Sequence, residues 1–149
     1  MTKHEITADE AIALAKSYNE SGNAIGQFRL KYWDQMSDEQ RLVLGNIANS
    51  LFDHSQDLTT YAAGKILDDT QASLAQIQKA TAQANQVIQR INGIRKVITI
   101  GTALVSLGAA IYTENPSGIA SALEGVVNAV KSGSAVGGNG NSGSGNGDS

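Results

Sequence analysis

The segment VITIGTALVSLGAAIYTENPSGIASALEGVVNAV, residues 97–130, decides the fold of this chain. Its 34 residues carry only two charges, Glu114 and Glu124. Near its middle, residues 114–118 read ENPSG and contain the only proline of the chain, and proline and glycine favour a tight turn. The segment therefore predicts two apolar helices that fold back on each other as a hairpin.

Both arms of this predicted hairpin are short for a membrane span. Residues 97–113 form 17 residues without a charge, which is about 25 Å of helix against about 30 Å of bilayer hydrocarbon. Residues 117–130 would measure about 21 Å. These lengths favour partial insertion, embedding in one leaflet or a locally thinned bilayer. Lys96 and Lys131 bracket the open end and are expected to anchor it at an interface.

Each arm also carries polar and small residues at helical spacing. The polar residues are Thr99, Thr102, Ser106 and Thr113 on one arm, and Ser117, Ser121, Glu124 and Asn128 on the other. Small residues recur at every fourth position: Thr102, Ser106 and Ala110, then Ser117, Ser121, Gly125 and Ala129. Such rows let helix backbones approach closely in lipid, so they are predicted to be packing faces.

The apolar side chains of the arms are the predicted membrane-inserting residues. They are Val97, Ile98, Ile100, Leu104, Val105, Leu107, Ile111, Ile119, Leu123, Val126, Val127 and Val130. Glu114 and Pro116 belong to the turn, and a carboxylate inside a membrane, such as Glu124, is expected to face water or a partner. A hairpin buried in a soluble bundle, or one that forms a self-association surface, would have a similar composition, so these alternatives stay open.

Amphipathic helices are predicted before the hairpin. Thr7–Glu10 and Ser37–Gln40 match the capping-box pattern and predict helix starts, the first helix ending near Asp34. Two apolar stripes follow at alternating spacings of three and four, which place each stripe on one helix face. They are Ala11, Leu14, Tyr18, Ser21, Ile25, Phe28 and Tyr32, then Leu44, Ile47, Leu51, His54, Leu58 and Tyr61.

A third stripe runs without a break into the apolar segment. It consists of Ile77, Ala80, Ala84, Val87, Ile91, Ile94 and Ile98. This phase predicts a single helix from about Gln71 to Tyr112, roughly 60 Å long. Residues 68–70, Asp-Asp-Thr, are either its cap or an exposed polar turn, and no strand pattern is present.

The predicted fold is all-α: an elongated antiparallel bundle with an apolar helical hairpin as its head. One domain covers residues 1–131, with the amphipathic bundle in 7–96 and the hairpin in 97–130. Residues 132–149 are almost entirely Gly, Ser and Asn, and such a segment is expected to form a flexible tail.

Composition argues against several functional classes. The chain has 149 residues, a net charge of −3 and no cysteine. Its Lys and Arg residues are spread along the sequence, so no basic face and no nucleic-acid partner are predicted. No catalytic, phosphate-binding or dinucleotide-binding motif is present, and the two histidines lack metal-ligand spacing, so no enzyme activity, metal or cofactor is predicted. The N-terminus does not read as a cleaved signal peptide.

Two smaller features have simple packing interpretations. His54 belongs to the second stripe and is interpreted as a partly buried packing residue, with a pH switch as the alternative. Phe28, Tyr32 and Trp33 are interpreted as core packing at a helix end, with a ligand cage as the alternative.

The helix, apolar segment, ENPSG turn and returning helix of residues 71–131 resemble the cytolysin A-type α-helical pore-forming toxins. The short chain is most similar to the smallest component of the tripartite toxins of Gram-negative bacteria. This resemblance implies a secreted protein that binds a target lipid membrane through the hairpin and assembles with two larger toxin components into a lytic pore. It also implies a soluble form that hides the hairpin, with a homo-oligomer expected. The main alternative is a helical structural or assembly protein whose hairpin is a bundle core or an oligomer interface, and a third possibility is a phage holin-like or secretion-translocator protein.

Overall fold

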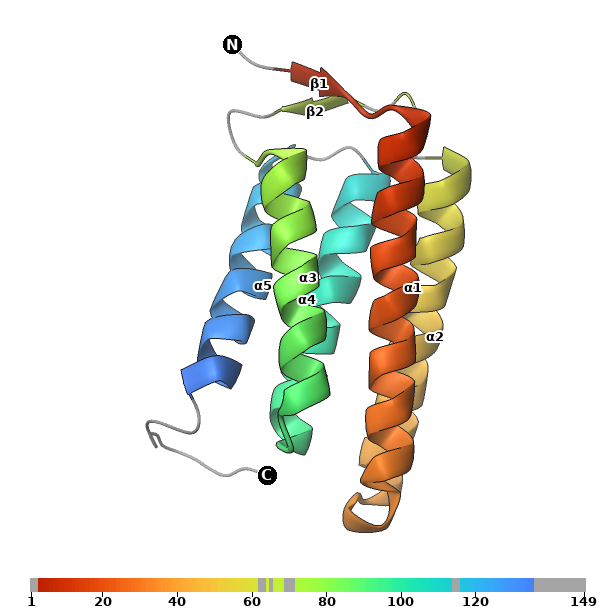
Figure 1. Cartoon of the computed structure of the whole chain (residues 1–149), viewed down its shortest axis with the longest axis vertical. Helices are drawn as coiled ribbons and strands as arrows, with labels where there is room; N and C mark the ends of the chain where they lie inside the picture. The colour runs from red at the N-terminus through yellow and green to blue at the C-terminus, as the bar shows by residue number, and fades with distance from the viewer. Residues whose placement is uncertain (1–2, 62–63, 65, 69–71, 114–115, 136–149) are drawn as a thin grey trace.

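Five helices follow one another up and down the described part of the molecule, so that each runs antiparallel to the next (Figure 1). The structure is a computed structural model and describes residues 3–61, 64, 66–68, 72–113 and 116–135. The helices are α1 (Ala8–Lys31), α2 (Asp38–Tyr61), α3 (Leu74–Arg90), α4 (Ile94–Tyr112) and α5 (Pro116–Ala135), with a short 3₁₀ helix η1 (Trp33–Gln35) after α1. The predicted all-α antiparallel bundle is confirmed.

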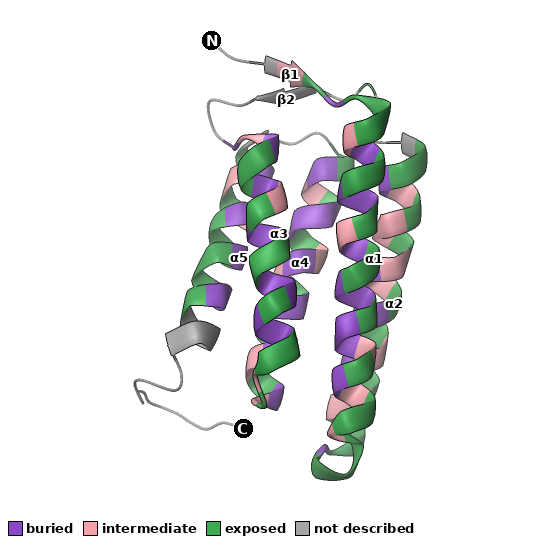
Figure 2. Cartoon of the chain, viewed as in Figure 1, coloured by how far each residue is buried: buried purple, intermediate pink, exposed green. Residues whose placement is uncertain are grey.

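The helices close a ring around one hydrophobic core. α1 packs against α2 and α3, α2 packs against α4, α4 against α5, and α5 against α3. Buried residues line the inward faces of all five helices (Figure 2). The hairpin α4–α5 lies alongside the other helices, so the predicted head is folded back against the amphipathic part of the bundle.

The predicted stripes are the inward faces of the first three helices. In α1 the stripe is buried from Ala11 to Phe28, and Tyr32 just beyond the helix is half-buried. In α2 and α3, Leu44, Leu51 and Ile77 are buried, while His54 is half-buried as expected for a packing histidine at a helix edge. The alternating spacing of three and four therefore located the core correctly.

Capping boxes begin three of the helices. The Glu10 amide donates to Thr7 Oγ1 at 3.1 Å and the Thr7 amide donates to the Glu10 carboxylate at 2.9 Å, and Ser37–Gln40 repeats this exchange. Both boxes were predicted from the sequence. The third belongs to Ser73 and Gln76 at the start of α3. Neither of the two interpretations of residues 68–70, a helix cap or an exposed polar turn, holds for Asp68, which ends a strand, while Asp69 and Thr70 lie outside the described residues.

The predicted continuous helix from Gln71 to Tyr112 is wrong. α3 ends at Arg90, Ile91 has an extended backbone, and α4 starts after Gly93, which is its N-cap residue. Asn92 and Gly93 are weak helix formers and common turn residues. A reversal here lets the apolar face of α4 pack against α2, whereas a single helix of about 60 Å would leave that face in water.

Two short strands also depart from the prediction of helices alone. β1 (Lys3–Glu5) pairs antiparallel with β2 (Ile66–Asp68), with His4 opposite Leu67. Gly64 precedes β2 with φ of 88°, and its amide donates to the Ile6 carbonyl at 2.8 Å. This small sheet covers one end of the bundle and ties the α2–α3 connection to the N-terminus (Figure 1).

The C-terminal helix is longer than predicted. α5 begins at Pro116 and continues to Ala135. Proline is favourable at the first position of a helix, because the N–H that it lacks would have no partner within the helix there. The predicted flexible segment starts at residue 132, so its first four residues are helical. The rest of that segment, 136–149, lies outside the described residues.

Close helix contacts are made possible by glycines on the inner faces. A Cβ placed on Gly101 of α4 would lie 2.7 Å from Ile47 Cγ2 and 2.9 Å from Ile25 Cδ1, and a Cβ on Gly22 would lie 2.7 Å from a ring carbon of Phe52. Real Cβ atoms do not approach this closely. The backbones of α4 and α1 therefore rest directly on side chains of neighbouring helices.

Substituting Gly101 and Gly125 by alanine separates packing from helix propensity. A Cβ at Gly125 meets nothing within 4 Å, so Gly125→Ala should stabilise the fold by about 0.5–1 kcal/mol through helix propensity alone. Gly101→Ala gains the same propensity but overpacks the core, which costs about 1–3 kcal/mol, so we expect a net loss. Urea unfolding of both variants gives the comparison, and equal shifts of the two midpoints would contradict the close packing at Gly101.

Candidate membrane-active hairpin

The predicted membrane-inserting side chains face the core in this structure. Nine of the twelve are buried, Ile98 and Val105 are half-buried, and Val127 is exposed. The buried ones are Val97, Ile100, Leu104, Leu107, Ile111, Ile119, Leu123, Val126 and Val130. The apolar face of the hairpin is therefore covered by the rest of the bundle.

The outer face of the hairpin consists mostly of small and polar residues, together with the exposed Tyr112 and Val127. All eight of the predicted polar positions are exposed: Thr99, Thr102, Ser106, Thr113, Ser117, Ser121, Glu124 and Asn128. Two of the hydroxyls already have partners in their own helix, since Thr99 Oγ1 donates to the Arg95 carbonyl at 3.0 Å and Thr113 Oγ1 donates to the Ala109 carbonyl at 3.1 Å. This face is compatible with water, yet part of its hydrogen bonding does not depend on water.

The predicted packing rows of small residues do not join α4 to α5. Thr102 and Ser106 on α4, and Ser117, Ser121 and Gly125 on α5, are exposed. The larger apolar side chains on the inner faces of the two helices belong instead to the common core, because in water these side chains gain most from burial. Among the predicted rows, only Ala129 is buried and Ala110 half-buried.

Gly108 is a second point, after Gly101, where α4 approaches both α1 and α2 closely. A Cβ there would lie 2.8 Å from His54 Cδ2 and 3.0 Å from Tyr18 Cε2. The missing side chain admits both rings, which pack edge to face with centroids 6.2 Å apart. The rings occupy a space that any other residue at position 108 would fill.

Both rings use this space to hydrogen-bond the backbone of α4. The Tyr18 hydroxyl donates to the Leu104 carbonyl at 2.8 Å. His54 Nε2 lies 3.1 Å from the Val105 carbonyl, so Nε2 carries the hydrogen of this bond. Burial raises the pKa of Tyr18 far above its ordinary value, so its hydroxyl remains a donor wherever the protein is folded. We call these two bonds the α4 clamp.

A second buried polar contact fastens α3 to α1. Ser21 Oγ lies 2.5 Å from Asn85 Oδ1, and the Asn85 amide nitrogen donates to the Ser17 carbonyl at 3.3 Å. Ser21 and Asn85 are both buried. Buried polar groups need such partners, so the contact fixes how α3 sits along α1.

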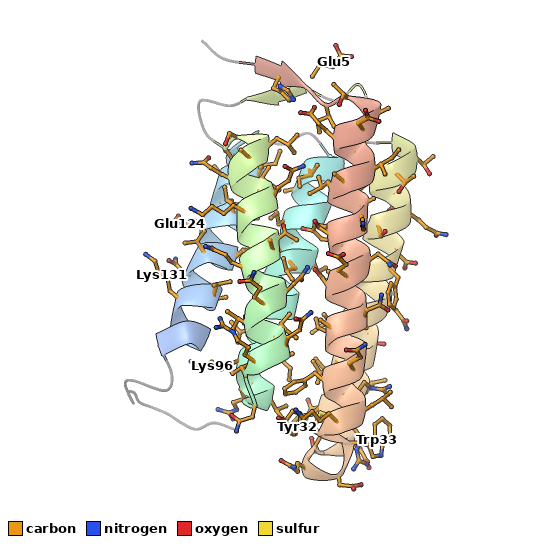
Figure 3. The ribbon with its side chains drawn as sticks, in the orientation of Figure 1. Glu5, Tyr32, Trp33, Lys96, Glu124 and Lys131 are labelled. Carbon is orange, nitrogen blue, oxygen red and sulfur yellow. The ribbon has the colours of Figure 1, made fainter. Side chains whose placement is uncertain are left out.

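The charged and turn residues of the hairpin lie at its surface where they are described. Glu124 is exposed on α5, and Lys131 is exposed near the end of α5 (Figure 3). Lys96 is half-buried in the first turn of α4. Pro116 is the first residue of α5, and Glu114 lies outside the described residues.

The aromatic cluster at the α1–α2 turn is only partly core. Phe28 is buried and packs against the half-buried Tyr32. Trp33 is instead exposed, and the guanidinium groups of Arg29 and Arg41 each lie 4.7 Å from its ring centroid. The predicted core packing is therefore right for Phe28 and wrong for Trp33.

Comparisons with protein families, curated proteins and solved structures find nothing that matches this chain. Within the described residues, α4 is the one helix long and apolar enough to cross a membrane, a property that buried helices of soluble proteins share. The described residues contain no group of His, Cys, Asp or Glu side chains arranged to hold a metal ion.

Removing one hydroxyl tests the α4 clamp. Tyr18→Phe deletes the bond to Leu104 while leaving the ring in place, and a net hydrogen bond contributes about 1 kcal/mol. We expect a lower urea midpoint with an unchanged slope, and faster amide exchange in the middle of α4. Tyr32→Phe removes the same hydroxyl from the tyrosine just after α1. It should change the urea midpoint and the amide exchange of α4 less. Equal exchange in the two variants would contradict the clamp.

Proposed function

We propose that this protein is a non-enzymatic, membrane-binding component of a multi-part α-helical pore-forming toxin. In this proposal it is secreted, inserts the α4–α5 hairpin into a target membrane and assembles with two larger partner components. The structure described above would be its water-soluble form, in which the hairpin is hidden against α1, α2 and α3.

The observation that carries the proposal is the two-sided character of the hairpin. The inner face of the hairpin is apolar and buried, while the outer face of α4 from Thr99 onward consists mainly of small residues, including Thr99 and Thr113, whose hydroxyls bond their own helix. An ordinary surface helix carries charged residues on its outer face. Between Val97 and Thr113, α4 carries none, so both of its faces can enter lipid at little polar cost.

The contacts of the hairpin are consistent with its release as a unit. α4 and α5 pack closely on each other, and α4 is attached to α1 and α2 by the glycine contacts and the α4 clamp. Insertion into lipid would replace its apolar burial in the bundle. The core faces of α1, α2 and α3 would then be uncovered, and larger helical partners are suited to cover them.

The third apolar stripe supports a route for this release. Ile91 and Ile94 keep the same phase on either side of the Asn92–Gly93 reversal. If the reversal straightened, α3 and α4 would form one helix with a continuous apolar face. α4, about 28 Å long, would then project beyond the end of the bundle at which α3 stops.

A helical structural or assembly protein is the second candidate. The burial of nine of the twelve predicted inserting residues favours it, because a permanent core would look the same. In that case the hairpin never leaves the bundle. The two candidates therefore differ in whether α4 and α5 enter a membrane.

A reversible cross-link between α2 and α4 tests whether the hairpin leaves. A Cβ on Gly108 would lie 3.0 Å from His54 Cγ, which suits the sulfur of a disulfide in the double variant His54→Cys with Gly108→Cys. The chain has no cysteine that could mispair. We expect the reduced double variant to become resistant to carbonate extraction from vesicles, and the oxidised one to be extracted. Carbonate-resistant insertion of the oxidised protein would contradict release of the hairpin.

A charge on the outer face separates the two candidates without disturbing the core. Thr102 on α4 and Thr59 on α2 are both exposed threonines. An Asp at either position should change stability in water by less than about 0.5 kcal/mol, whereas a charge near the centre of an inserted helix costs about 3 kcal/mol. Thr102→Asp should therefore abolish carbonate-resistant insertion, and Thr59→Asp should not. Equal insertion of the two variants would contradict the entry of α4 into lipid, and a lack of insertion by the unmodified chain as well would favour the assembly protein.

A further inference from the structure

Basic side chains gather at one end of the bundle, contrary to the prediction that they are dispersed. This end contains the α1–α2 turn and the α3–α4 connection, and Figure 3 places Trp33 and Lys96 there and Glu5 at the opposite end. Six of the eleven Lys and Arg residues of the chain belong to it, and we call them the basic end: Arg29, Lys31, Arg41, Arg90, Arg95 and Lys96.

The excess positive charge comes from the α3–α4 connection. In the α1–α2 turn, Asp34, Asp38 and Glu39 balance the three basic residues, and Asp38 pairs with Arg41 at 3.1 Å. Between Arg90 and Lys96 there is no carboxylate. The other end of the bundle carries Glu5, Asp9, Glu10 and Asp57, so the molecule has opposite charge at its two ends.

Helix stability does not explain the placement of Arg95 and Lys96. Both lie in the first turn of α4, where the positive end of the helix dipole disfavours cations. Gly93, the N-cap residue, supplies no side-chain hydrogen bond there. The N-terminus of α4, which has no side-chain cap, and its two cations therefore both contribute positive potential at the α3–α4 connection.

Apolar side chains accompany the charge. Leu30 is 73% exposed, Leu42 is 63% exposed and Trp33 is 37% exposed, and all three lie within the α1–α2 turn or the helix ends beside it. They are three of the six exposed large hydrophobic residues in the described part of the chain. This turn also projects beyond the α3–α4 connection (Figure 1). Trp together with Arg and Lys is the combination that prefers the headgroup region of a bilayer.

We propose that the basic end binds an anionic phospholipid surface, end-on, while the hairpin is still folded in the bundle. Charge complementarity selects anionic headgroups, and the exposed Leu30, Trp33 and Leu42 favour a bilayer over a nucleic acid, whose surface offers no apolar phase. The net charge of −3 does not prevent this contact. α1 is about 36 Å long, and at 0.1 M salt the screening length is about 10 Å, so the acidic end is screened from the surface.

The chain carries its own reporter for this contact. Trp33 is the only tryptophan, so its emission should shift to the blue when phosphatidylserine-containing phosphatidylcholine vesicles are added, and should stay unchanged with phosphatidylcholine alone. Molar salt should reverse both the shift and the co-sedimentation with vesicles. The oxidised His54→Cys, Gly108→Cys protein should bind equally well, because this contact does not use the hairpin.

Two matched double variants test the location of the contact. Lys31→Gln with Arg95→Gln removes two exposed cations from the basic end, and Lys16→Gln with Lys79→Gln removes two exposed cations elsewhere, with the same change in net charge. A cation near an anionic surface contributes about fivefold in affinity, so the first pair should weaken vesicle binding on the order of twentyfold. The second pair should bind as the unmodified chain does.

Equal binding of the two pairs, or retention on duplex DNA without retention on vesicles, would overturn the proposal. The inference can also fail separately from the proposed function. Salt-reversible binding at the basic end without carbonate-resistant insertion keeps the inference and contradicts the toxin function. Carbonate-resistant insertion that is unchanged by the Lys31 and Arg95 substitutions supports the toxin function and contradicts the inference.

Discussion

The close approach of α4 to α1 and α2 at Gly101 and Gly108 is the constraint on which the rest of the structure depends. At both glycines, a Cβ would lie within 3 Å of a neighbouring side chain. Because the backbone of α4 lies so close to α1 and α2, the side chains of Tyr18 and His54 reach carbonyls in the middle of α4. These contacts set the rotation of α4 about its axis, and that rotation decides which residues meet water.

The rotation of α4 explains why its outer face, after Arg95 and Lys96 in the first turn, is small and polar without being charged. With Gly101, Leu104 and Gly108 turned inward, Thr102 and Ser106 must face outward. A permanent core helix at the edge of a ring would gain solubility from Lys or Glu at such positions. Hydroxyl side chains give less solubility, but they keep the helix compatible with both water and lipid. The composition of this face is thus the feature that a purely structural role explains least.

Local signals in the sequence predicted local structure well. The capping boxes at Thr7 and Ser37 need only four residues each, and the apolar stripes identify inward faces because helical periodicity is a local property. The reversal at Asn92–Gly93 was missed because the phase of Ile91 and Ile94 continues across it, and only packing against α2 distinguishes a turn from a straight helix.

Features that depend on distant parts of the chain could not be predicted in this way. β1 pairs with a strand more than sixty residues later, and neither is long enough to show alternation. The glycines at 101 and 108 were visible, but their neighbours Ile47 and His54 lie on another helix. The basic end is invisible in sequence for the same reason, since Lys31 and Arg95 lie at one end of the bundle only because α1 and α3 both run toward it.

The position of the basic end connects the two proposals through the geometry of α3. α3 runs toward that end and stops there at Arg90, and α4 turns back from it. A membrane bound by Arg90, Arg95 and Lys96 would therefore lie where α4 would project if the Asn92–Gly93 reversal straightened. The cations would then sit at the headgroups, and the uncharged residues from Val97 onward would enter the hydrocarbon, about 25 Å deep along α4. The same connection thus places the charges that contact the surface directly before the residues suited to cross it.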